Sequence, residues 1–133
     1  MTTELTMLAW TLVLALAQVF LPVGGKTLVW GSKWNAGPRD ETPDKPLPPM
    51  TGRLDRAQAN LYETLPVFIA AVLIAHVADR NSTFTAFGAQ LYFWARVVYV
   101  PLYALGVPYV RSLAWVASFI GLVMILLSIF GVV

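Results

Sequence analysis

Residues Arg53 to Phe68 read RLDRAQANLYETLPVF, and this stretch decides how the whole chain is interpreted. At about 100° of rotation per residue, Arg56, Asn60 and Glu63 share one face of a helix, and Arg53 lies one turn earlier. The two arginines can mark the boundary between water and membrane, but Asn60 and Glu63 lie about 6 and 10 Å deeper along the helix. Ionisable groups at that depth are costly unless they are paired or line a wet cavity. The pattern therefore predicts a polar site between membrane helices.

The composition supports an integral membrane protein. Of the 133 residues, 58% are hydrophobic and only 12% are charged, about half the charged share of an average soluble domain. The chain has no cysteine, which excludes disulfides, thiolate metal sites and a cysteine nucleophile, and the single His76 cannot form a histidine metal site alone. A net charge of +2 without a basic run gives no indication of nucleic-acid binding.

Four apolar segments predict a single all-α domain, a four-helix bundle in the membrane. We expect helices at about 5–23, 54–77, 84–105 and 109–132, with a long polar connection over 26–51 that contains five of the nine prolines. A cleavable signal peptide is the alternative for the first segment. Glu4 stands where such a peptide would carry Lys or Arg, and no small-residue cleavage site follows promptly. The first segment is therefore predicted to be a transmembrane helix.

The basic residues predict the orientation in the membrane. Four spans place the first and third connections on the same side, and Arg80 is the only basic residue on the opposite side. By the positive-inside rule, we expect the long connection in the cytoplasm and both termini outside. The basic residues on the expected cytoplasmic side are Lys26, Lys33, Arg39, Lys45, Arg53, Arg56 and Arg111.

A second polar group lies in the third predicted helix. Arg96, Tyr99 and Tyr103 are spaced i, i+3 and i+7 and share one face. Counted from the cytoplasmic side, they lie at depths that match the polar face of the second helix to within about one turn. We therefore expect Glu63 and Arg96 to neutralise each other at the bottom of a polar cavity that opens to the cytoplasm.

These two stretches carry a resemblance to a known family. RAQANLYETLPVF, followed in the next helix by ARVVYVPLY, resembles the MAPEG family, the membrane-associated proteins in eicosanoid and glutathione metabolism, in its bacterial type. The motifs are R-A-x-x-N-x-x-E and A-R-x-x-Y-x-x-x-Y, and the likeness covers nearly the whole chain in helix number and order. It implies a four-helix protomer, a homotrimer in a bacterial inner membrane, and glutathione bound between adjacent subunits near the cytoplasmic face.

The resemblance also implies which residues contact glutathione. Gln58 matches a contact to the neighbouring subunit's ligand, and Arg53 is added because it lies at the mouth of the helix. In two places the sequence departs from the family pattern: Thr64 stands where the leukotriene-forming branch often has tyrosine, and the thiol-activating arginine falls at Val110, one residue before Arg111. Arg111 is the catalytic candidate if a small change of register is allowed. The expected ligand-binding residues are Arg53, Arg56, Gln58, Asn60, Glu63, Arg96, Tyr99 and Tyr103.

Two functions remain open from the sequence. The first is a glutathione-dependent transferase or peroxidase that acts on lipophilic small molecules entering from the lipid bilayer. The second is a non-catalytic structural or accessory subunit that keeps the polar cavity, alone or within a larger membrane complex. The retained polar residues favour the first function, and the displaced arginine favours the second.

Overall fold

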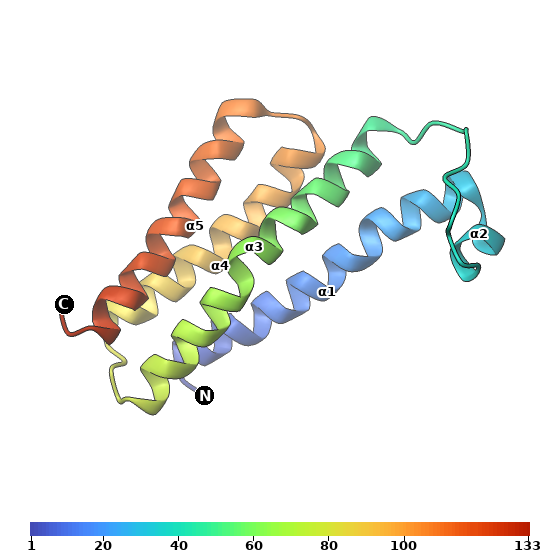
Figure 1. Cartoon of the computed structure of the whole chain (residues 1–133). Helices are drawn as coiled ribbons and strands as arrows, with labels where there is room; N and C mark the ends of the chain where they lie inside the picture. Colours follow the sequence, from blue (N-terminus) through green and yellow to red (C-terminus); the bar gives the residue numbers. More distant parts are fainter.

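The computed structural model describes residues 1–133 and contains five helices and no strands (Figure 1). The all-α prediction is confirmed. A short helix, α2, follows the first of four long ones. The elements are α1 (Thr3–Trp30), α2 (Ser32–Ala36), α3 (Pro49–Val77), α4 (Thr83–Ala104) and α5 (Pro108–Ile129).

Three of the helices, α1, α3 and α5, are long and apolar enough to cross a membrane. Such lengths fit a hydrocarbon core of about 30 Å. Helix α4 is not among the three, although it has the same 22 residues as α5. Its side chains include Gln90 and Arg96, which lower its mean hydropathy. The helix that carries the second predicted polar group is therefore less apolar than α5.

The predicted start of the long connection at residue 26 is wrong. Helix α1 continues through Gly24 and Gly25 to Trp30 and ends at Gly31, whose φ of +92° is a conformation that favours glycine. A Cβ at position 25 would lie 2.5 Å from Oγ1 of Thr51. This glycine therefore allows α1 to approach the start of α3 closely and does not interrupt the helix. The connection without helix is limited to residues 37–48.

Two tryptophans, Trp30 at the end of α1 and Trp34 in α2, hold this connection against the helices. Nε1 of Trp30 donates to the carbonyl of Lys45 at 2.8 Å, and Nε1 of Trp34 donates to that of Glu41 at 3.0 Å. The two indoles also meet edge to face, with ring centroids 4.6 Å apart. The proline-rich segment therefore folds back on α1 and α2, at the end of the molecule that lies far from both termini (Figure 1).

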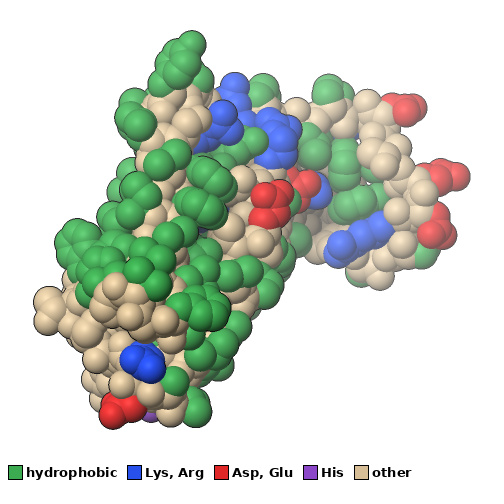
Figure 2. Space-filling model, turned by 60° about the vertical axis from the view of Figure 1, so that its left-hand side comes forward, with side chains coloured by type: hydrophobic (Ala, Val, Ile, Leu, Met, Phe, Trp, Pro, Cys, Tyr) green, Lys and Arg blue, Asp and Glu red, His purple; other side chains and the backbone are tan.

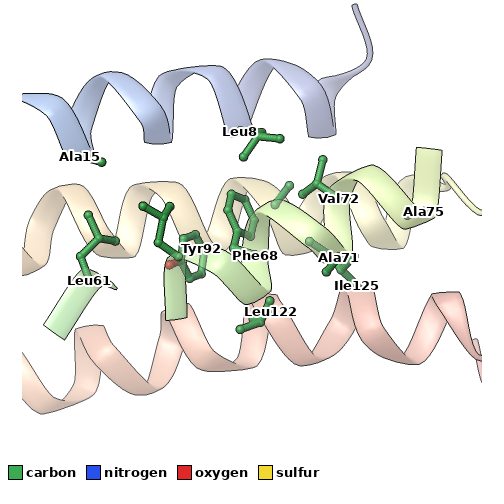
Figure 3. Packing of buried hydrophobic residues seen from close by; sticks show 12 residues of the cluster. Leu8, Ala15, Leu61, Phe68, Ala71, Val72, Ala75, Tyr92, Leu122 and Ile125 are labelled. Atoms are coloured by element: carbon green, nitrogen blue, oxygen red, sulfur yellow. The ribbon is translucent and has the colours of Figure 1, made fainter. Parts of the chain in front are cut away.

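The hydrophobic core lies between all four long helices (Figure 3). Phe68 of α3 and Tyr92 of α4 stack at its centre, with ring centroids 4.0 Å apart. Helices α4 and α5 share the most extensive interface in the chain. They cross where Gly88 faces Gly121, so closely that a Cβ at position 121 would lie 2.4 Å from the carbonyl oxygen of Gly88. This crossing fixes how α5 stands beside α4.

Candidate functional site

Basic side chains surround a cavity of about 260 Å³ at the end of the molecule where α3 begins and α4 connects to α5. Figure 2 shows Lys and Arg side chains gathered at one end above a body that is largely hydrophobic. The connection between α4 and α5 supplies the rest of the wall. The lining residues are Arg53, Arg56, Tyr103, Gly106, Val107, Pro108 and Arg111.

Tyr103 organises this first cavity. Nε of Arg56 donates to the Tyr103 hydroxyl at 3.3 Å. The guanidinium of Arg111 lies over the Tyr103 ring, with Cζ 4.6 Å from its centroid, a distance at which the ring attracts a cation. Tyr103 therefore brings an arginine from α3 and an arginine from α5 to the same place.

Arg53 is placed by the turn that follows α4. Its Nη1 lies 3.4 Å from the carbonyl oxygen of Ala104, to which it donates. Gly106 has a φ of +74°, and a Cβ there would lie 2.9 Å from Cζ of Arg53. Glycine thus serves two needs at this position, the left-handed backbone and the close approach of the guanidinium.

A second cavity of about 210 Å³ lies beside the first and shares Arg111 with it. Its polar wall comes from α3 and α4, and its apolar wall comes from α5. The lining residues are Asn60, Tyr99, Arg111, Ser112, Trp115 and Val116. Because Arg111 borders both cavities, a molecule that fills the two would pass directly against its guanidinium.

Arg96 lies behind the second cavity and is only 1% exposed. Its Nη1 donates to Oδ1 of Asn60 at 2.8 Å, and its Cζ stands 4.3 Å from the centre of the Tyr99 ring. Nε and Nη2 of Arg96 are buried and have no hydrogen-bond partner in the chain. The guanidinium thus holds two residues of the cavity wall without lining the cavity itself.

The predicted ion pair between Glu63 and Arg96 is wrong within this chain. The chain has one ion pair, between Lys26 and Asp55 at 3.1 Å. Glu63 is exposed, because three residues beyond Asn60 the helix has turned it about 60° away from the position that faces Arg96. Arg96 lies level with Asn60, to which it donates, and Glu63 follows Asn60 by three residues, so depths that match to within about one turn did not place the two side chains on facing sides.

The other expected site residues divide into two groups. Arg53, Arg56, Tyr103 and Arg111 line the first cavity, and Asn60, Tyr99 and Arg111 line the second. Gln58 and Glu63 line neither cavity. Val110, the position to which an ungapped count assigns the thiol-activating arginine, is 51% exposed and outside both cavities. The structure therefore puts Arg111, and not Val110, beside the polar residues.

One polar contact near the site was not expected from the sequence. Thr64 Oγ1 and the Tyr92 hydroxyl share a hydrogen bond of 2.8 Å, one turn deeper in the bundle than the pair formed by Asn60 and Arg96. The spacing in the sequence could have indicated this hydrogen bond. Thr64 lies four residues after Asn60, and Tyr92 lies four residues before Arg96. Antiparallel helices bring such equally spaced residues together.

The two cavities favour an acceptor group with negative charge. Three arginines and two tyrosines line them, and no Asp or Glu does. Arginine carries five N–H donors and no acceptor, and it binds carboxylates in a bidentate geometry. The arrangement therefore suits a molecule with one or more carboxylates.

The fold and this site define an all-helical membrane protein with a basic, anion-accepting pair of cavities near one end. Residues 7–131 match the family model of the MAPEG family. The chain belongs to this family, so the resemblance seen in the sequence is confirmed. A search of curated proteins finds no match.

Proposed function

We propose that the chain binds glutathione in the two cavities and acts on lipophilic electrophiles, either as a transferase that joins glutathione to them through its sulfur or as a peroxidase that oxidises glutathione to reduce them. Membership of the MAPEG family supports a role in glutathione or eicosanoid metabolism. The observation that carries the proposal is that Arg111 lines both cavities, and that no Asp or Glu of the chain lines either of them.

Glutathione fits this set of donors. It carries two carboxylates and one ammonium group, and Arg53 and Arg56 stand at the first cavity to hold a carboxylate. When bound, glutathione supplies the thiol for the reaction. Arg111 would lie near that thiol, and a nearby cation lowers a thiol's pKa and so raises its thiolate fraction at neutral pH. In this proposal Arg111 is the catalytic residue.

The proposal includes an arrangement in the membrane. Helix α4 crosses the membrane together with α1, α3 and α5. The end with the two cavities faces the cytoplasm, because nearly all basic residues of the chain lie toward that end. The termini are then outside. Lipophilic substrates reach the second cavity from the bilayer, past Trp115 and Val116 of α5. The protein is a homotrimer in a bacterial inner membrane, and the exposed Glu63 and the half-buried Gln58 lie on α3 where a neighbouring copy would contact them.

Arg56→Ala tests the proposal, with Arg80→Ala as the matched control at the opposite end. Loss of a hydrogen bond to a charged group costs about 1.5–3 kcal/mol, which is roughly a tenfold to hundredfold loss of affinity. Equilibrium binding of glutathione to the purified protein should therefore weaken at least tenfold in Arg56→Ala and stay unchanged in Arg80→Ala. Equal affinities in the three proteins would refute a glutathione site at Arg56.

A non-catalytic accessory subunit is the second candidate. The observation that favours it is Glu63, which the family resemblance assigns to glutathione but which lines neither cavity in the chain. Turnover of a generic aromatic electrophile, measured with and without glutathione, separates the candidates. Glutathione-dependent turnover that disappears in Arg111→Leu supports the enzyme, whereas binding without any turnover supports the accessory subunit.

A further inference from the structure

One face of α4 points out of the bundle. Helices α1 and α5 each pack against both α3 and α4 but not against each other, so α3 and α4 present their free faces on opposite sides. The exposed residues of α4 recur every three or four positions, which is the spacing of one helical face. This outward face of α4 consists of Thr83, Phe87, Gln90, Trp94, Val98 and Pro101. It is separate from the face of α3 where the trimer contact is proposed.

Gln90 is the polar residue in the middle of the outward face. It lies seven residues into α4, about 10 Å along a helix of about 33 Å, so in the proposed arrangement it is inside the hydrocarbon core. The side chains of α4 that form hydrogen bonds are Thr85, Tyr92, Arg96 and Tyr103. Lipid acyl chains offer no hydrogen-bond partner, and an unpaired amide in hydrocarbon is costly. The exposed amide of Gln90 therefore requires a polar partner from outside the chain.

An apolar groove of about 350 Å³ lies beside Gln90, between α1 and α4. Gln90 precedes two of the groove residues, Phe93 and Trp94, by one turn of the same helix. Trp94 is 58% exposed and lies near the middle of α4, too deep for a tryptophan that anchors a helix at the membrane surface. An amide beside an apolar groove is typical of contacts between membrane helices, where amides form hydrogen bonds from one helix to the next. The groove is lined by Met7, Trp10, Phe93, Trp94 and Val97.

We propose that the outward face of α4 binds the same face of a second copy of the chain, around a twofold axis normal to the membrane. Such an axis preserves depth, so each Gln90 meets the other at the same level. An amide carries both donors and an acceptor, so two Gln90 side chains can satisfy each other across a self-complementary contact. The groove then receives an apolar side chain from the α4 of the second copy. This inference takes from the proposed function only the position of α4 in the membrane, and it does not require glutathione.

Cysteine cross-linking tests the contact, because the chain has no cysteine of its own. Gln90→Cys places one thiol in each copy beside the twofold axis, and copper phenanthroline with oxygen oxidises two adjacent thiols to a disulfide. In membranes that contain the full chain, we expect this variant to form covalent dimers. Phe119→Cys is the matched control. Since Gly88 faces Gly121 on antiparallel helices, Phe119 of α5 lies level with Gln90, and it is 45% exposed but on a different face. It should not form dimers.

Phe87→Cys reports on the amide itself. Phe87 is 56% exposed and lies one turn from Gln90 on the outward face, so a cysteine there should also cross-link while Gln90 is intact. Adding Gln90→Leu should reduce the initial rate of cross-linking by about threefold to twentyfold for each amide hydrogen bond lost. Adding Gln90→Asn keeps an amide and should preserve the cross-link. Both variants should show the circular-dichroism spectrum of the wild type, since Gln90 supports no hydrogen bond within the fold.

The possible outcomes either support or overturn the contact. Dimers from Gln90→Cys but not from Phe119→Cys, with a slower reaction after Gln90→Leu, support it. Equal cross-linking at the two positions would mean random collisions, and no cross-linking at position 90 would mean that lipid or another protein covers the face; either result overturns the inference. An unchanged rate after Gln90→Leu overturns the role of the amide. A wild type that does not bind glutathione would contradict the proposed function alone and leave this contact in place.

Discussion

Gly121→Ala should destabilise the protein, although it replaces glycine by a better helix former inside a helix. The added Cβ would lie 2.4 Å from the carbonyl oxygen of Gly88 and 2.8 Å from the backbone nitrogen of Tyr92. Ordinary contact begins near 3.4 Å, so the two helices must separate by about 1 Å at the crossing. Both obstructing atoms belong to the backbone, so no side-chain rotation can make the room.

The size of the effect follows from two opposing terms. Overpacking a close contact costs about 1–3 kcal/mol. Alanine in place of glycine gains roughly 0.8–1 kcal/mol of helix propensity. The net expectation for Gly121→Ala is a loss of up to about 2 kcal/mol. Gly24→Ala is the matched control, because Gly24 lies within α1 and a Cβ there meets nothing within 4 Å. This second variant should keep the propensity gain and be more stable than the wild type.

Thermal unfolding in a mild detergent, followed by the fluorescence of the five tryptophans, measures both changes. We expect the midpoint to fall for Gly121→Ala and to rise for Gly24→Ala. The opposite signs matter more than the sizes, since the same atoms are added in both variants. A Gly121→Ala protein as stable as Gly24→Ala would show that α4 and α5 do not cross as closely as described.

Three other predictions concern the polar contacts and the orientation. Thr64→Val should cost about 1–3 kcal/mol, because it leaves the buried Tyr92 hydroxyl without a partner, and adding Tyr92→Phe should recover most of this loss in thermal unfolding. Lys26→Met should cost less than about 1 kcal/mol, and the difference from wild type should shrink at high salt, since the partly exposed pair with Asp55 is screened. Asp44→Cys introduces the sole cysteine, and a membrane-impermeant maleimide should label it only from the cytoplasmic face. Labelling from outside would show that the predicted orientation is wrong.

The helices could be predicted from the sequence, but one boundary could not. Runs of apolar residues reveal long helices directly, and Pro49 and Pro108 stand at the first helical positions of α3 and α5, where proline is well tolerated. Gly24 and Gly25 suggested a helix end that the structure does not contain. The reason is tertiary, because Gly25 is needed where α1 approaches Thr51. A single sequence does not distinguish a glycine that ends a helix from one that allows close packing.

For the candidate site, the sequence identified several of the residues but not which of them contact each other. Spacing along one helix identified Arg56 and Asn60, and spacing along the next identified Arg96 and Tyr103, because helical periodicity depends only on the local sequence. The partner of Arg96 depends on how α3 is rotated against α4, and the buried side chains of α3 determine that rotation. Within the chain, this rotation of α3 directs Asn60 to Arg96 and leaves Glu63 exposed.

The contacts between α3 and α4 form a series that runs inward from the first cavity, and this series explains which parts of the site are fixed. Four hydrogen bonds join the two helices in order of depth, and none of them involves α5. They are Arg53 to Ala104, Arg56 to Tyr103, Asn60 to Arg96, and Thr64 to Tyr92.

Arg111 reaches the site separately, from α5. Its place over Tyr103 depends on how α5 packs against α4, and the crossing of Gly88 and Gly121 sets that packing. A wider crossing in Gly121→Ala should therefore displace Arg111 while the contacts between α3 and α4 remain. Under the proposed function, carboxylate binding at Arg56 would then persist while thiol activation declines, so turnover should fall more than glutathione affinity.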